Sequence, residues 1–532
     1  MNKRLLLAVA LISFLINAQP DLSDQIGFGG DGFTSGANII PSDNLSFFIC
    51  GSSRSSQNSG NLDIDHFGSS DCFLMKLTND LEVLWQKSYG GEDFDATAKI
   101  TSSNDAVYLF SSSRSGVSGN KTTSSFGDID GWLLKLDLEG NIIWQKNYGG
   151  TGADQARDVY LLDDGSILLF LTSRSPISGN KTAPLKGERD VWVIKLDSDG
   201  VVIWDKTFGT NGDVSINDVA SLNNGQYAIA ATCIGDCDAI NDKTESAYSS
   251  TDTWAICINT NGDVVWDRTI GGDESELFPS LIEREGEINL ISASESNPSG
   301  VRSAPKKGGQ DIWMVTLNLE GEILSDISFG GDGFDTPTKL YKQDDELVIL
   351  SRSNSGVSHD KTEENRGEVD YWIIKLNNEK EVIWDKTIGG TAGDSPNSLL
   401  YRDGRYIIGG VSSSEKSGDK EIEKFNSDPI ATDIWIVVLD EDINTNSIIE
   451  DIVSQVEVYP NPTIDELIIK LTNQVYVEKI DIYDIQGNKV ISERFGTNDE
   501  LVKVDVSKLA LGSYILNIQG DGFAIRKQVV KQ

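Results

Sequence analysis

The sequence is poor in histidine and in basic residues. Its 532 residues include 2 His, and 45 Lys and Arg stand against 83 Asp and Glu, which gives a formal net charge of −38. Because contact with phosphates requires clustered Lys and Arg, no nucleic-acid partner is expected. His66 and His359 lie far apart in the chain, so neither a zinc site nor a nucleophile–base pair is expected from them.

Long apolar runs are also missing. The apolar stretch Leu5–Ile16 has 12 residues, follows Lys3 and Arg4, and precedes a cleavage site after Ala18. A membrane-spanning helix needs about 20 apolar residues. We therefore expect residues 1–18 to be a secretory signal peptide, and we expect no transmembrane segment.

Cysteine is scarce and its count is odd. The chain has 5 Cys, namely Cys50, Cys72, Cys233, Cys237 and Cys257, and none of them forms a CxxC pair. At least one thiol is therefore unpaired within the chain. Export permits one local disulfide, which could join Cys50 to Cys72, or Cys233 to Cys237 or Cys257.

One feature is abundant, namely an internal repeat of about 60 residues. An Asp, one further residue and an aromatic residue recur seven times, at Asp71/Phe73, Asp130/Trp132, Asp190/Trp192, Asp252/Trp254, Asp311/Trp313, Asp370/Trp372 and Asp433/Trp435. A glycine pair or its variant also recurs seven times, at Gly29, Gly90, Gly149, Gly209, Gly271, Gly330 and Gly389. A second Trp precedes the glycines in five repeats, at Trp85, Trp144, Trp204, Trp266 and Trp384.

Each repeat reads as four short strands. In one repeat, apolar stretches at 95–101, 106–113, 131–137 and 141–147 are separated by turn signals and by a longer polar loop at 115–129. Helical periodicity is not convincing anywhere. Seven repeats of four strands predict an all-β fold, a seven-bladed β-propeller over residues 19–440.

The two ends of the repeat region complement each other. The seventh repeat stops after residues 433–440 and has no fourth strand of its own. Residues 22–30 end in Phe28-Gly29-Gly30, which matches Ile388-Gly389-Gly390. We expect the N-terminal strand to complete blade seven, which closes the ring and removes two open sheet edges.

Two resemblances follow from these motifs. Lys135-Leu136-Asp137 to Gly140 and Trp144 resembles the blade motif of quinoprotein-type propellers, although the adjacent cysteines of that family are absent. The whole repeat, with Trp-x-Lys before the glycine pair, resembles propeller repeats of exported Bacteroidetes proteins. These resemblances imply the fold and no particular chemistry.

The C-terminal region differs in composition from the repeats. It contains Val458-Tyr459-Pro460-Asn461-Pro462, then residues 480–487, 511–516 and 526–531 with alternating apolar and polar positions. Residues 456–532 are similar to the type A C-terminal sorting domain of the type IX secretion system. The resemblance implies a small immunoglobulin-like β-sandwich, recognised by the secretion machinery, on a protein that is secreted or held at the outer-membrane surface. Residues 441–455 are the expected linker.

Acidic residues follow the glycine pairs and form the first set of candidate site residues. These are Asp95, Asp154, Asp213, Glu276, Asp335 and Asp394, with Thr34 at this place in the first repeat. If the first strand of each blade is innermost, the acids surround the channel mouth, and such a ring could hold Ca²⁺. The alternative is that each acid caps a glycine-rich turn within its own blade.

The long polar loop supplies the second set. Its candidates for contact with an extracellular glycan or a surface protein are Asn120, Lys121, Asn180, Lys181, Asp360 and Lys361. The same residue types are common in solvated turns, so this interpretation stays open beside ligand contact.

Two functions remain open. Near-identical blades favour a secreted or surface-displayed binding or adhesion protein. The alternative is a polysaccharide-degrading enzyme, which should have one blade with acidic or aromatic departures that the other blades lack.

Overall fold

A computed structural model describes residues 19–57, 59–441, 456–459, 462–471, 477–483, 489–497, 501–520 and 523–532. The expected signal peptide at 1–18, residues 442–455 of the expected linker, and the tail residues 460–461 and 484–487 lie outside this description. The chain divides into two compact units, Met1–Glu441 and Asp442–Gln532. In the described residues there is no helix that is long and apolar enough to cross a membrane.

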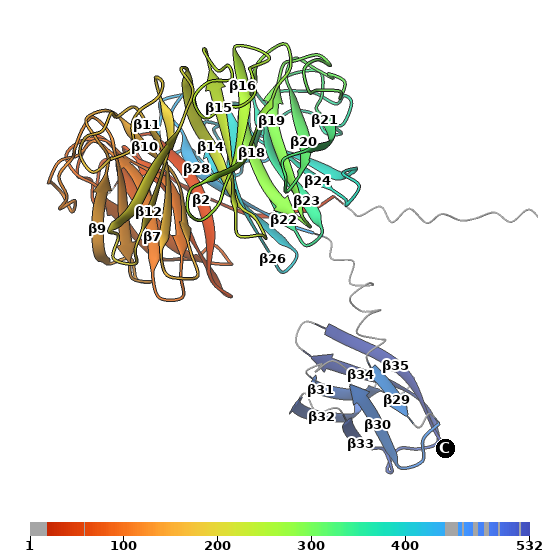
Figure 1. The fold of residues 1–532 in the computed structure, drawn as a ribbon. Helices are drawn as coiled ribbons and strands as arrows, with labels where there is room; N and C mark the ends of the chain where they lie inside the picture. The colour runs from red at the N-terminus through yellow and green to blue at the C-terminus, as the bar shows by residue number, and fades with distance from the viewer. Residues whose placement is uncertain are drawn as a thin grey trace, which may run out of the picture. The chain divides into compact units, whose positions relative to one another are not determined.

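The first unit consists of seven antiparallel sheets of four strands each, which confirms the predicted fold class (Figure 1). The first strands are β2 (Thr34–Asp43), β6 (Asp95–Ser102), β10 (Asp154–Leu161), β14 (Asp213–Ser221), β18 (Glu276–Arg284), β22 (Asp335–Gln343) and β26 (Asp394–Arg402). The second strands are β3 (Ser46–Ser53), β7 (Val107–Ser113), β11 (Ile167–Ser173), β15 (Tyr227–Ile234), β19 (Glu287–Ser294), β23 (Glu346–Ser353) and β27 (Arg405–Ser412).

The outer half of each sheet is equally regular. The third strands are β4 (Asp71–Thr78), β8 (Asp130–Leu136), β12 (Asp190–Leu196), β16 (Thr251–Ile258), β20 (Asp311–Asn318), β24 (Asp370–Leu376) and β28 (Asp433–Asp440). The fourth strands are β5 (Val83–Tyr89), β9 (Ile142–Tyr148), β13 (Val202–Phe208), β17 (Val264–Ile270), β21 (Ile323–Phe329), β25 (Val382–Ile388) and, in the seventh sheet, β1 (Asp21–Phe28). We number the blades one to seven by their first strands, from β2 to β26.

The first strands are the innermost ones. Neighbouring first strands lie against one another, as β14 and β18, β18 and β22, and β2 and β26 do. The loop that enters each first strand and the long loop between the second and third strands therefore emerge on one face of the ring.

Blade seven is assembled from both ends of the unit. Strand β1 pairs antiparallel with β28, with Gln25 opposite Val437 and Phe28 opposite Ile434. The indole nitrogen of Trp435 donates to Gln25 Oε1 at 3.1 Å. In blade two, Trp132 donates in the same way to Gln145 of β9, so β1 replaces a fourth strand in both backbone and side-chain contacts.

The repeated tryptophans pack within and between blades. Trp132, Trp192, Trp254, Trp313, Trp372 and Trp435 on the third strands are fully buried. The Trp residues of the fourth strands reach the next blade, as Trp85 does where it packs on Gly140. Burying one indole contributes up to about 5 kcal/mol as an upper bound, which explains why the sequence repeats it.

One disulfide forms, between Cys233 and Cys237 in blade four. It is one of the pairs that the sequence left open. Cys50, Cys72 and Cys257 are buried free thiols.

The second unit is a two-sheet sandwich. One sheet has β29 (Val456–Tyr459), β30 (Glu466–Leu471) and β33 (Leu501–Asp505), and the other has β32 (Lys489–Thr497), β31 (Val477–Tyr483), β34 (Gly512–Gly520) and β35 (Phe523–Lys531). Alternating apolar residues such as Ile469, Ile480, Val504 and Leu516 form its core. This agrees with the predicted small β-sandwich.

Candidate functional site at the channel mouth

The acids that follow the glycine pairs are buried inside their own blades. Asp95, Asp154, Glu276, Asp335 and Asp394 have no exposed surface. Each accepts a hydrogen bond of 2.7–3.0 Å from the second glycine of the pair that follows the preceding blade's last strand. Each is also bound by a serine hydroxyl, as Asp95 is by Ser115 at 2.7 Å.

These contacts favour the alternative that each acid caps a glycine-rich turn over the calcium ring. No three His, Cys, Asp or Glu side chains among the described residues are placed to hold a metal ion. The acids instead cap the turns that carry the chain from one blade to the next. Burial is the largest influence on the pKa of these carboxyl groups. It raises the pKa of Asp95, Asp335 and Asp394, and it raises the pKa of Glu276 to about 7.

Asp213 does not belong to this set. It lies one residue too early in blade four, and its carboxylate pairs with Arg189 and Arg174. The buried position that five other blades give to an acid is held by Val214, which lies opposite Cys233. Thr210 and the disulfide Cys233–Cys237 replace the polar contacts there.

The three lysines predicted to contact a ligand are buried. Lys121, Lys181 and Lys361 are 1% exposed. Their ammonium groups lie 5.6–5.9 Å from the ring centres of Trp132, Trp192 and Trp372. They donate to backbone carbonyls, as Lys121 does to Ser115 and Thr123. Burial lowers the pKa of all three, and no surface remains for a ligand.

The neighbouring amides and Asp360 also contact the chain itself. Asn120 accepts from Gly90 N–H at 2.9 Å and donates to Ser88 O at 2.8 Å. Asn180 makes the same two contacts with Gly149 and Asn147, and Asp360 accepts from Gly330. These half-buried side chains fix the long loop of one blade to the last strand of the preceding blade, so they support the turn interpretation.

A feature that the sequence did not reveal occurs in every first strand. The pairing of the first and second strands is interrupted by a β-bulge just after the strand begins. The bulged residues are Gly36 and Ala37, Ala98, Arg157, Asn217, Phe278 and Pro279, Thr338, and Asn397. Bulges redirect side chains and are common beside binding sites.

The residues that follow the bulges form a polar network inside the channel. Lys99 pairs with Asp158 at 3.1 Å, Lys339 pairs with Asp218, and Ser280 donates to Asp218 at 2.6 Å. Burial alone would raise the pKa of Asp218, but Lys339 and Lys99 hold it below its usual value. The network joins blades two, three, four, five and six, and it lies one residue deeper than the bulges.

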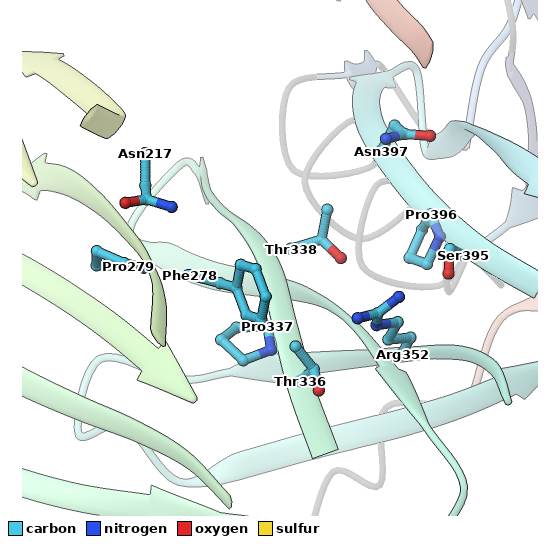
Figure 2. Close-up of a pocket in the computed structure, with 10 residues that line it drawn as sticks. All are labelled: Asn217, Phe278, Pro279, Thr336, Pro337, Thr338, Arg352, Ser395, Pro396 and Asn397. Carbon is cyan, nitrogen blue, oxygen red and sulfur yellow. The ribbon is translucent and has the colours of Figure 1, made fainter. Parts of the chain in front are cut away.

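A cavity of about 250 Å³ lies at the level of the bulges. It is lined by Asn217, Phe278, Pro279, Thr336, Pro337, Thr338, Arg352, Ser395, Pro396 and Asn397 (Figure 2). The bulges of blades four to seven supply five of these residues.

Three of the four blades that line the cavity lack a contact that other blades make. In blades two, three and four the second residue after the capping position donates its N–H to a hydroxyl of the preceding blade, as Ala156 does to Ser112 at 3.0 Å. In blades five, six and seven this residue is Phe278, Pro337 or Pro396. Proline has no N–H to donate, and Phe278 makes no such contact with a hydroxyl in the described chain, so this contact between blades is absent in blades five, six and seven.

Phe278 is held in an unfavourable backbone conformation. Its φ is +53°, and no other non-glycine residue within a described strand has a positive φ. Its side chain is nevertheless 47% exposed. A bulky residue in this region of φ costs of order 1–3 kcal/mol, and such strain gathers at functional sites.

Arg352 is the charged residue of the cavity wall. It lies between the Thr336–Pro337 segment of β22 and the Ser395–Pro396 segment of β26 (Figure 2). It is exposed. Within the described part of the chain its guanidinium has neither an ion-pair partner nor a hydrogen-bond partner.

Comparison with known proteins identifies the second unit. Residues 457–532 match the family described as "Secretion system C-terminal sorting domain". The regulatory protein FlaEY of Caulobacter vibrioides is 24% identical over 264 residues, which covers 48% of this chain and 27% of that protein. The chain thus matches about a quarter of the length of this curated relative.

Solved structures of low similarity span most of the chain. The phage phi92 endosialidase has 12% identity and a TM-score of 0.41, and the match covers 96% of this chain and 79% of that one. The WD40 domain of Neurospora crassa Pan2 has 8% identity and a TM-score of 0.40, with 79% and 97% covered. The match over residues 457–532 and the seven four-stranded sheets before it show that the chain carries a secretion-system C-terminal sorting domain after a β-propeller, and that it is exported to the cell surface or the extracellular space.

Proposed function

We propose that this exported propeller binds an extracellular ligand, a glycan or a surface protein, without transforming it, and that the cavity at the channel mouth is the binding site. One observation carries the proposal. The departures of blades five, six and seven from the contact that blades two, three and four make converge on one cavity.

The composition of the cavity favours binding over hydrolysis. Its lining offers an exposed aromatic ring, three prolines, amides, hydroxyls and one cation. Glycoside hydrolysis uses a pair of carboxylic acids, and general acid–base catalysis most often uses His or carboxylates. None of the ten lining residues is Asp, Glu or His.

The test is a glycan-array screen of the full-length protein beside the variant Phe278→Ala. The proposal predicts at least one bound glycan class, no turnover of it, and a loss of about tenfold or more in affinity for Phe278→Ala, since central aromatic anchors carry much of a binding energy. Phe334→Ala is the matched control, because Phe334 is 53% exposed and does not line the cavity.

The screen is repeated with EDTA in place of Ca²⁺. Because five of the six candidate calcium ligands are buried and bound to Gly and Ser groups, and Asp213 is paired with two arginines, the same binding is expected in both buffers. Binding that Phe278→Ala leaves unchanged would contradict the proposed site. Turnover of a bound glycan would contradict the non-catalytic role.

A further inference from the structure

We propose that the ligand of the channel-mouth cavity is a carboxylated sugar unit, such as a uronate ring of an acidic polysaccharide. This inference rests on the proposed function and names its ligand class. It joins three features of the cavity wall, namely an unpaired guanidinium, an exposed aromatic ring, and free hydrogen-bonding groups.

The guanidinium supplies the charge selectivity. A planar guanidinium binds a carboxylate through two parallel hydrogen bonds, which is stronger and more specific than a neutral contact. Two other exposed arginines of the propeller already lie beside a carboxylate, since Arg114 pairs with Asp128 and Arg174 pairs with Asp213. Arg352 has none in the described chain, so its donors are available to a ligand.

The net charge of the protein does not prevent this contact. The formal charge is −38, but charges farther apart than about 8 Å are screened at physiological ionic strength. The nearest acids on the same inner strands, Asp335 and Asp394, are fully buried and bound to glycine N–H and serine hydroxyl groups. The cavity wall therefore differs in charge from the average surface.

Phe278 supplies an apolar platform. Its ring is 47% exposed and lines the same cavity as Pro337 and Pro396. Ligand sites combine such apolar surface with a few polar groups that fix orientation. The C–H face of a pyranose ring fits this surface, whereas a bare inorganic anion would leave it exposed to water.

Polar groups around the ring remain free for sugar hydroxyls. Asn217 accepts from Thr232 at its oxygen, which leaves the two amide hydrogens unused. The hydroxyls of Thr338 and Ser395 have no hydrogen-bond partner in the described chain. The volume of about 250 Å³ is below the range of about 300–1,000 Å³ typical of drug-sized ligands, so one sugar unit or a chain end fits, not a long segment.

The test measures the affinity of the full-length protein for short uronate oligosaccharides and for the same oligosaccharides after reduction of their carboxyl groups. Isothermal titration calorimetry is suitable. We expect the carboxylated form to bind at least about tenfold more tightly. Arg352→Gln should abolish this difference, Arg352→Lys should restore part of it, and Arg114→Gln should leave it unchanged.

The outcomes separate this inference from the proposed function. If reduced oligosaccharides bind equally well, or if Arg352→Gln has no effect while Phe278→Ala weakens binding, the carboxylate inference is wrong and the binding site stands. Tight binding of an acidic peptide with no saccharide bound would overturn the sugar class. If Phe278→Ala leaves the affinity for every bound compound unchanged, the site itself is wrong. Melting temperatures of the variants exclude unfolding as the cause.

Discussion

At the scale of single residues, the repeated side chains of this propeller are architectural. Asp71 accepts from the N–H groups of Phe67 and Gly68, and its carboxylate lies so close to Gly90 that an added Cβ would stand 1.9 Å from an Asp71 oxygen. Glycine is therefore required at this place. The capping acids, the buried lysines and the Trp rings add further packing and hydrogen-bond contacts that recur in several blades.

Glu276 provides a test of this architecture through pH. Burial raises its pKa to about 7, from a usual value of 4.5. Between pH 4.5 and 7 the folded state binds more protons than the unfolded state, so the free energy of unfolding falls as the pH rises through this window, by at most about 3 kcal/mol. Above pH 7 this change is complete.

Urea unfolding from pH 4 to 8 checks the expectation. Glu276→Gln should flatten the dependence in that window, and Glu320→Gln, at an exposed turn of the same blade, should not. Parallel curves for wild type and Glu276→Gln would mean that the carboxyl is not held as described.

At the scale of elements, the bulges decide what the cavity presents. In each first strand a bulge of one or two residues interrupts the pairing after the capping position. In blade five the bulge includes Phe278, and its strain indicates that the exposed ring is retained against a stability cost.

Phe278→Gly should separate stability from binding. Glycine adopts positive φ without strain, so the variant should gain about 1 kcal/mol in unfolding free energy while it loses ligand affinity. Phe334→Gly, where φ is ordinary, should lose stability instead. Chemical denaturation of both variants provides the measurement, and a destabilised Phe278→Gly would refute the interpretation of strain.

The sequence predicted the fold because its determinants are periodic. The Asp, Gly and Trp anchors recur in every blade, and the capping role of Asp71 and its equivalents is a local contact. It could not predict the site, because a bulge depends on pairing geometry that residues such as Asn217 and Thr338 do not reveal. The sequence does distinguish Asp213 from the other candidate acids. It follows Gly209 by four residues, whereas each of the other acids follows its glycine by five.

At the scale of the whole molecule, ring closure joins the ends of the first unit. The N-terminal strand β1 is the outermost strand of blade seven, and Gly29 packs against Asp433 as the equivalent glycines do in other blades. The C-terminal strand β28 lies between β27 and β1. The chain therefore leaves the first unit from the interior strand β28, and not from the closing strand β1.

Deletion of residues 20–30 should open the ring. The unpaired edge of β28 and the lost contact of Trp435 with Gln25 should give aggregated or protease-labile protein. The milder variant Gly29→Ala should lower the midpoint of thermal unfolding, because its Cβ would stand 2.1 Å from Asp433. Limited proteolysis and thermal melts provide the readout, and a soluble deletion of unchanged heat stability would contradict closure by β1.

The proposed ligand site at the channel mouth is formed by blades four to seven together. The most direct measurement is a crystal structure of the full-length protein with the glycan that it binds most tightly on the array. We expect a sugar unit on the ring of Phe278 with a polar group at Arg352. A ligand bound instead to the outer strands, or to the face of short hairpin turns, would contradict this expectation.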